Sequence, residues 1–383
     1  MVQDSELNQG NVLSSLSIRF PEKTFYLGQV FQDTTNSYKL VWFLAILSLL
    51  KRSEERAFRI IDIFTEMAVI AWHPVCLYRL SLGRQDKLQN GIMEIKTQFQ
   101  LPADAEPVAV RKFVETNSQI SDRLAFLRIY VPTRFLTPWF ADKLKGVRSD
   151  LQRTRDIERL AKESQGTPFA TPYYLEGTRT SPVVKLNESW RAFFIDNLGI
   201  VQAFAEYHLA LYLQARNPNV PGVVNKLRAP TTRQLRAARE FWRLARRDFE
   251  QSGRSDIFRD IYSQNSLSEN FAIDHFLPWS FVVHDLLWNL APVEPTTNSK
   301  KSDCLPDLDK YLPALAEMHF RAMEVSLKRP RLLEDYIDCF KQEPEKLLAL
   351  GQDGFMAKYR EVMLPQARIA MNQGFQSGWV LRN

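Results

Sequence analysis

Four polar residues in one stretch of the chain have the side-chain types that a hydrolytic site requires. They are Asp274, His275, Asn289 and Asn298. A histidine accepts a proton from water near neutral pH, which is the first step in making water a nucleophile. Carboxylate and amide oxygens are ligands that hard divalent cations prefer, so this set favours Mg²⁺, with Mn²⁺ as an alternative, over Zn²⁺. The combination suits hydrolysis of a phosphodiester, in which positive groups offset charge on the phosphate.

The same residues belong to a longer motif. It reads D-H-x-x-P-x-S-F, then W-N-L, then N-x-x-K-S-D-x-L-P, within residues 271–306. Taken singly, each residue has an ordinary structural interpretation, because an Asp-His pair is usually a hydrogen-bonded pair and an asparagine often caps a turn. Taken together, the motif resembles the HNH, or ββα-metal, nuclease family. It is similar in particular to the HNH domain of type II RNA-guided CRISPR effector nucleases and to free-standing prokaryotic HNH proteins.

The resemblance implies a role for each residue of the motif. His275 is expected to be the general base that activates water, and Asp274 and Asn298 are expected to be the ligands of Mg²⁺. Asn289 is expected to brace the loop after the first strand, and Lys301 to lie near the scissile phosphate. These roles predict a metal-dependent DNA endonuclease, and they leave RNA open as a substrate.

The chain departs from the wider family at two points. The third ligand position holds Asn298, where many members have a histidine, so only one protein ligand is anionic. Metal binding is therefore expected to be weak in the absence of DNA. Paired zinc cysteines are also absent, since Cys76, Cys304 and Cys339 are far apart in the sequence. These cysteines match neither a disulfide framework nor a zinc clamp, and they predict a reducing cytoplasm.

Two elements must position the motif residues. Residues 258–262 and 270–275 alternate as strands do and are expected to pair as a hairpin, with Asp274 and His275 at its end. A helix predicted over residues 231–250 precedes them and is expected to follow a phosphate backbone with one basic stripe. The stripe consists of Arg233, Arg236, Arg239, Arg243, Arg246 and Arg247. A solvated face without a ligand is the alternative interpretation of this charge run.

Elsewhere the patterns predict an α+β fold that is predominantly α-helical, with the small ββα module embedded in it. We expect a mainly helical region over 1–230, the nuclease module with its basic helix over 231–308, and a helical region over 309–383. The apolar run at 40–50 is shorter than the roughly 20 residues that cross a membrane, so it predicts a buried core helix. Residues 188–216 predict one long helix, and proline-rich residues 167–187 predict a small hairpin or a loop.

Composition limits the class of protein without assigning a substrate. The 383 residues are 45% hydrophobic, enough for buried cores, and the start lacks the pattern of a signal peptide. A formal net charge of +6 permits a polyanionic partner such as DNA. One site cuts one strand, so a double-strand break predicts a homodimer or two successive nicks. The resemblance implies a standalone or operon-encoded role in antiviral defence or restriction, and a nucleic-acid-binding subunit gated by a partner is the rival hypothesis.

Overall fold

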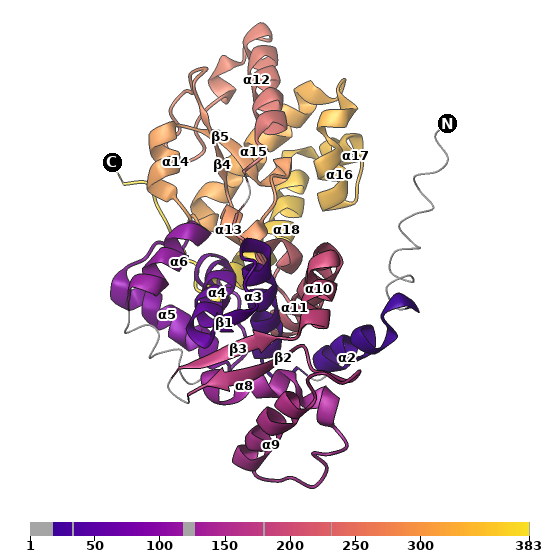
Figure 1. The fold of residues 1–383 in the computed structure, drawn as a ribbon. Helices are drawn as coiled ribbons and strands as arrows, with labels where there is room; N and C mark the ends of the chain where they lie inside the picture. Colours follow the sequence, from indigo (N-terminus) through magenta and orange to yellow (C-terminus); the bar gives the residue numbers. More distant parts are fainter. Residues whose placement is uncertain (1–17, 33, 118–126, 179–180, 231, 383) are drawn as a thin grey trace. The chain divides into compact units, whose positions relative to one another are not determined.

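The chain folds into two compact units, each dominated by helices (Figure 1). The computed structural model describes residues 18–32, 34–117, 127–178, 181–230 and 232–382. The first unit lies within Met1–Pro218 and Val223–Ala229, and the second within Asn219–Gly222 and Pro230–Asn383. The described strands are few and short, so the predominantly helical α+β fold predicted from the sequence is confirmed.

Helices accompany a small antiparallel sheet in the first unit. The strands lie in the order β1 (Ala57–Arg59), β3 (Pro182–Leu186) and β2 (Tyr173–Gly177). Strands β2 and β3 form a hairpin, which was one of the two alternatives predicted for residues 167–187. The helical elements are α2 (Pro21–Gln32), α3 (Tyr38–Arg52), α4 (Ile60–Trp72), η1 (His73–Leu77), α5 (Lys87–Phe99), α6 (Pro107–Thr116), α8 (Leu127–Phe135), η2 (Thr137–Phe140), α9 (Asp150–Glu163), α10 (Glu188–Asp196), α11 (Leu198–Arg216) and η3 (Val223–Lys226).

Helix α3 lies in the core of the first unit. Its apolar run at 40–50 is buried, so the prediction of a buried core helix is confirmed. Trp42 Nε1 donates to the Tyr173 hydroxyl at 2.9 Å, which ties the helix to the sheet. In the described part of the chain, only Ile60–Leu77 is long and apolar enough to cross a membrane, and 72% of it is buried inside the structure.

The single helix predicted over residues 188–216 is wrong. Helix α10 ends at Asp196 and α11 begins at Leu198, with Asn197 between them. The Asn197 side-chain amide donates to the carbonyl oxygen of Phe193 at 2.8 Å. A side chain that takes a backbone carbonyl in this way competes with continuation of the helix. The apolar periodicity runs on across the break, which is why the pattern alone did not reveal it.

One hydrophobic core unites the second unit. It is formed by α12 (Arg236–Gln251), by the strands β4 (Ala272–His275) and β5 (Leu290–Val293), and by the C-terminal helices. The remaining elements are η4 (Ser255–Ile257), α13 (Trp279–Val282), η5 (Leu287–Asn289), α14 (Pro295–Lys301), α15 (Leu308–Ser326), η6 (Pro330–Leu332), α16 (Glu334–Phe340), α17 (Pro344–Ala349) and α18 (Gly351–Asn372). The segment that carries the motif therefore shares its core with the helices before and after it.

The hairpin predicted between residues 258–262 and 270–275 is wrong. Strand β4 pairs instead with β5, which follows it in the chain. The earlier segment folds back on itself, because the Asp260 carboxylate accepts hydrogen bonds from the backbone amides of Tyr262 at 2.7 Å and Ser263 at 3.2 Å. An aspartate that binds the backbone two residues on is typical of a turn and ends an extended run.

Candidate active site

The motif surrounds a strand-strand-helix unit made of β4, β5 and α14, with Asp274 and His275 on β4, Asn289 on η5 just before β5, and Asn298 and Lys301 on α14 (Figure 1). Strand β4 ends with Asp274 and His275, and neighbouring residues of a strand point to opposite faces, so the two side chains have different partners. Helix α14 begins with Pro295, whose fixed φ and missing N–H suit the first helical position. The helix packs against β4, and Asn298 and Lys301 lie one turn apart on it.

A carboxylate and an ammonium form a buried pair at the centre of the site. Asp274 is 2% exposed and Lys301 is 0% exposed, and Lys301 Nζ lies 3.1 Å from Asp274 Oδ1. The same ammonium donates to the carbonyl oxygen of His275 at 2.7 Å. The residue expected beside a scissile phosphate thus lies within the protein, where it offsets the charge of Asp274 and fixes the end of β4.

Tyr262 supplies the second contact to the carboxylate, and sequence reasoning did not single it out. Its hydroxyl donates to Asp274 Oδ2 at 2.7 Å. Burial raises the pKa of Tyr262 well above its ordinary value, and the negative charges of Asp274 and Asp260 raise it further. The phenol therefore stays protonated and acts as a hydrogen-bond donor to the carboxylate.

His275 contacts a second carboxylate that sequence reasoning missed. Its Nε2 lies 2.8 Å from Asp285 Oδ1, and its side chain is 4% exposed. The other oxygen of Asp285 accepts from the backbone amide of Gln234 at 2.6 Å. Burial alone would raise the pKa of Asp285, but hydrogen bonds from His275 and Gln234, with the charges of His275 and Arg233, lower it below its ordinary value. Asp285 is therefore an anionic acceptor beside the candidate base.

Asn289 braces the loop that follows β4. Its side-chain oxygen accepts from the Leu277 amide at 2.8 Å, and its side-chain nitrogen donates to the Leu277 carbonyl oxygen at 2.9 Å. Its own carbonyl oxygen accepts from the Phe276 amide at 2.9 Å. Asn289 is fully buried, and these contacts engage both ends of its amide. The two residues after His275 are thereby held against the residue that precedes β5.

Asn298 is half-buried on α14, and its side chain forms no hydrogen bond with another residue in the described ranges. Its amide oxygen and the carboxylate of Asp274 are both hard donors that fit Mg²⁺, which binds few protein oxygens and retains water. Within the same ranges, no group of three or more His, Cys, Asp and Glu side chains could hold a metal ion. A site made of these two side chains, completed by water and substrate phosphate, is what the donor set fits.

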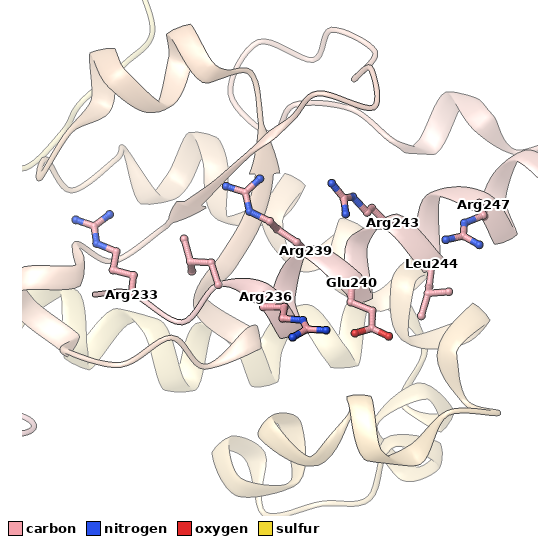
Figure 2. Close-up of a pocket in the computed structure, with 8 residues that line it drawn as sticks. Arg233, Arg236, Arg239, Glu240, Arg243, Leu244 and Arg247 are labelled. Atoms are coloured by element: carbon pink, nitrogen blue, oxygen red, sulfur yellow. The ribbon is translucent and has the colours of Figure 1, made fainter. Parts of the chain in front are cut away.

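A concave surface rich in arginine runs along α12 (Figure 2). Its volume is about 660 Å³. It is lined by Arg233, Leu235, Arg236, Arg239, Glu240, Arg243, Leu244 and Arg247, and we call it the arginine groove. Helical residues three and four apart share a face, and the opposite face of α12 is buried through Phe241, Trp242 and Phe249. Only one carboxylate lines the groove, so its surface is strongly positive.

Arg246 belongs to the predicted stripe but does not line the groove. Its side chain is 21% exposed and forms ion pairs with Glu250 at 2.9 Å and with Glu269 at 3.5 Å. The five arginines of the groove form no ion pair with a carboxylate in the described part of the chain. Their charges therefore remain available to a polyanion, whereas that of Arg246 is largely compensated.

The groove begins beside the candidate base. The guanidinium of Arg233 lies 5.4 Å from the centre of the Trp279 ring, a cation–π arrangement that holds it next to α13. Gln234 follows in the chain and donates its backbone amide to Asp285. Because Asp285 also contacts His275, one series of hydrogen bonds joins the segment before α12 to the imidazole.

Comparison with known proteins identifies the segment that carries the motif. Residues 259–307 match the family model described as HNH endonuclease. No curated protein and no solved structure matches the chain. The matched residues contain both strands and the helix of the site, together with Asp274, His275 and Asn298. Residues 259–307 therefore form an HNH endonuclease domain, and the chain is an HNH endonuclease domain protein.

Proposed function

We propose that the protein is a metal-dependent endonuclease that hydrolyses phosphodiester bonds of DNA. The placement of Asp274, His275 and Asn298 on one strand-strand-helix unit carries this proposal, because it joins a candidate base to hard oxygen donors. The family match supports nuclease activity in general terms. The arginine groove on the neighbouring α12 supplies the positive surface that a nucleic acid needs.

In the proposed mechanism, His275 takes a proton from the attacking water as a general base. Asp274 and Asn298 would hold a divalent cation, Mg²⁺ or in its place Mn²⁺, which would supply Lewis-acid stabilisation of charge on the phosphate oxygens. Asn289 keeps the loop after His275 in position through its two hydrogen bonds to Leu277. Lys301 orients the carboxylate of Asp274 and adds positive potential from within the protein.

The proposed substrate is duplex DNA bound along the arginine groove. Guanidinium groups bind phosphate oxygens and release counterions, which gives affinity without sequence preference. Arg246 is proposed to contribute less than the arginines of the groove, since it is paired with Glu250 and Glu269. We further propose that the protein acts in the cytoplasm in antiviral defence or restriction. It is proposed to form a homodimer or to work with an operon-encoded partner protein.

Cleavage of supercoiled plasmid DNA in magnesium chloride tests this function. Wild-type protein is expected to cut, and EDTA or the substitution His275→Ala is expected to abolish cutting. A parallel assay on RNA of matched sequence decides between the two nucleic acids, with faster cleavage of DNA as the expected result. Equal cleavage by wild type and His275→Ala would contradict the proposed role of His275 as the general base.

A second candidate function is a nucleic-acid-binding subunit whose nuclease site is opened by a partner. The observation that favours it is the burial of the site, since Asp274 is 2% exposed and already paired with Lys301. Such a subunit would bind DNA with a strong dependence on salt and would cut nothing in any divalent metal. Cleavage by the purified protein alone excludes this alternative.

A further inference from the structure

We infer that Asp285 is a positioning residue for His275, and that it leaves Nδ1 of the imidazole as the nitrogen that receives the water proton. The inference deepens the proposed function and rests on it, because it assigns a partner and an atom to the proposed general base. It stands on the 2.8 Å contact between His275 Nε2 and Asp285 Oδ1, and on the way the carboxylate is held.

The chemistry of the two groups fixes the direction of the hydrogen bond. An ionised carboxylate has no proton to donate, so it can only accept. The neutral imidazole must then carry its proton on Nε2 and expose its lone pair on Nδ1. With the side chain of His275 only 4% exposed, little water competes for Nε2. One carboxylate therefore selects one tautomer of the candidate base.

Asp285 is itself held on both sides. Its second oxygen accepts from the Gln234 amide at 2.6 Å, so the carboxylate cannot rotate without losing a hydrogen bond. It lies in the short connection between α13 and η5. The end of that connection is fixed separately, because the Leu287 amide donates to Asp335 at 2.6 Å. The imidazole is thus oriented by a carboxylate whose own position is defined by backbone contacts.

The two hydrogen bonds of Asp285 also connect the candidate base to the proposed substrate-binding surface. Gln234 lies between Arg233 and Leu235, both of which line the arginine groove. A hydrogen bond from Gln234 to Asp285 therefore keeps the start of the groove at a fixed distance from His275. Phosphate bound by Arg233 would be held in register with the base by the same carboxylate.

The experiment compares Asp285→Asn with wild type, with His275→Ala and with Asp335→Asn. The asparagine matches aspartate in size but has one acceptor oxygen in place of two, so it cannot keep the observed arrangement, in which one oxygen accepts from His275 and the other from Gln234. Asp335→Asn is the matched control, because Asp335 also accepts from a backbone amide of this connection and does not contact His275. Single-turnover cleavage is measured in magnesium, DNA affinity in calcium, and the His275 tautomer by nitrogen-15 NMR of the full chain in mildly alkaline buffer.

We expect Asp285→Asn to lower the cleavage rate about tenfold or more, but by less than the roughly 10²–10⁴-fold that loss of the general base itself costs, while DNA affinity stays unchanged. In the wild type, the NMR signal of His275 is expected to show only the tautomer that carries its proton on Nε2. In this variant, it is expected to show a mixture of the Nε2–H and Nδ1–H tautomers. Asp335→Asn is expected to keep both the rate and the tautomer. If Asp285→Asn misfolds, Asp285→Glu, which retains the carboxylate, is expected to recover the rate more than Asp285→Ala.

Two results overturn the inference in distinguishable ways. A wild-type rate in Asp285→Asn, or an unchanged tautomer with a rate loss equal to that of Asp335→Asn, removes Asp285 from the mechanism while His275→Ala remains inactive. A wild-type rate in His275→Ala overturns the proposed function itself, and the role of Asp285 falls with it.

Discussion

At the scale of single residues, the contact between Lys301 and Asp274 balances the charge of the carboxylate that is proposed to bind metal. A buried carboxylate without a partner is strongly unfavourable, and Lys301 removes that cost by placing an ammonium 3.1 Å away. A cation that binds Asp274 would supply the same compensation from the solvent side. The lysine and the proposed metal ion would therefore be alternative sources of positive charge for one carboxylate.

This relation predicts the behaviour of Lys301→Met. Removing one partner of a buried ion pair costs about 3–5 kcal/mol, so the free energy of unfolding in urea is expected to fall by that amount without metal. Magnesium is expected to restore more stability to the variant than it adds to wild type, since it replaces the lost charge. The control is Lys358→Met, because Lys358 lies at the surface in a pair with Glu361 and such pairs contribute about 0–1 kcal/mol. Equal stability of Lys301→Met and wild type would contradict the structural role.

The two asparagines of the motif are expected to respond differently to alanine. Asn289→Ala leaves two buried backbone groups of Leu277 unpaired, each at a cost of about 1–3 kcal/mol, so thermal unfolding should shift strongly downward. Asn298→Ala removes a side chain with no hydrogen bond to a described residue, so stability should hold while magnesium-dependent cleavage is lost. Thermal melts and cleavage assays on both variants check this, and the reverse pattern would exchange the two roles.

At the scale of elements, α12 combines a buried apolar face with the arginine groove on the other side. Periodicity allowed the basic stripe to be predicted, because the side chains that share a helical face recur every three or four residues. The helix itself begins at Arg236 rather than at residue 231, and Arg233 lies before it. Sequence periodicity did not separate Arg246 from the stripe, since only its carboxylate partners show that its charge is compensated.

The groove predicts a change in the salt dependence of DNA binding. Each phosphate contact contributes about 0.9 to the slope of log K against log salt on duplex DNA, so Arg239→Ala is expected to reduce that slope by about 1. Arg360→Ala is the matched control, because Arg360 is paired with Asp309 on a different helix and does not line the groove. Fluorescence anisotropy over a series of salt concentrations measures both slopes. Identical slopes for wild type and Arg239→Ala would place the DNA elsewhere.

The sequence predicted the residues of the site but not the pairing of the strands that position them. The motif predicted which side chains belong to one chemical site, since residue types and spacing are written in the chain. It did not predict that β4 pairs with β5, because LAPV is uniformly apolar and contains a proline, which argues against a paired strand. Tyr262 and Asp285 were missed for a related reason. Their contacts with Asp274 and His275 depend on the path of two loops that fold back onto the sheet. Sequence periodicity does not indicate the path of a loop.

At the scale of the whole molecule, each copy of the chain has one segment, residues 259–307, that matches the HNH endonuclease family. One proposed site acts on one strand, so supercoiled plasmid is expected to become nicked circles first and linear DNA later. If linear product requires two copies, its rate should rise more steeply with protein concentration than the rate of nicking. Agarose gels over a time course at several concentrations measure both. Linear DNA that appears without a nicked intermediate at low concentration would contradict single-strand cleavage by independent copies.

The most direct test of the account is the single-turnover rate of DNA cleavage by His275→Ala in saturating magnesium, compared with wild type. A general base contributes about 10²–10⁴-fold, so the rate is expected to fall by that factor. Binding of DNA in calcium and the thermal midpoint should remain close to those of wild type, which separates a chemical defect from misfolding. A rate for folded, DNA-bound His275→Ala that equals the wild-type rate would show that this histidine is not the base.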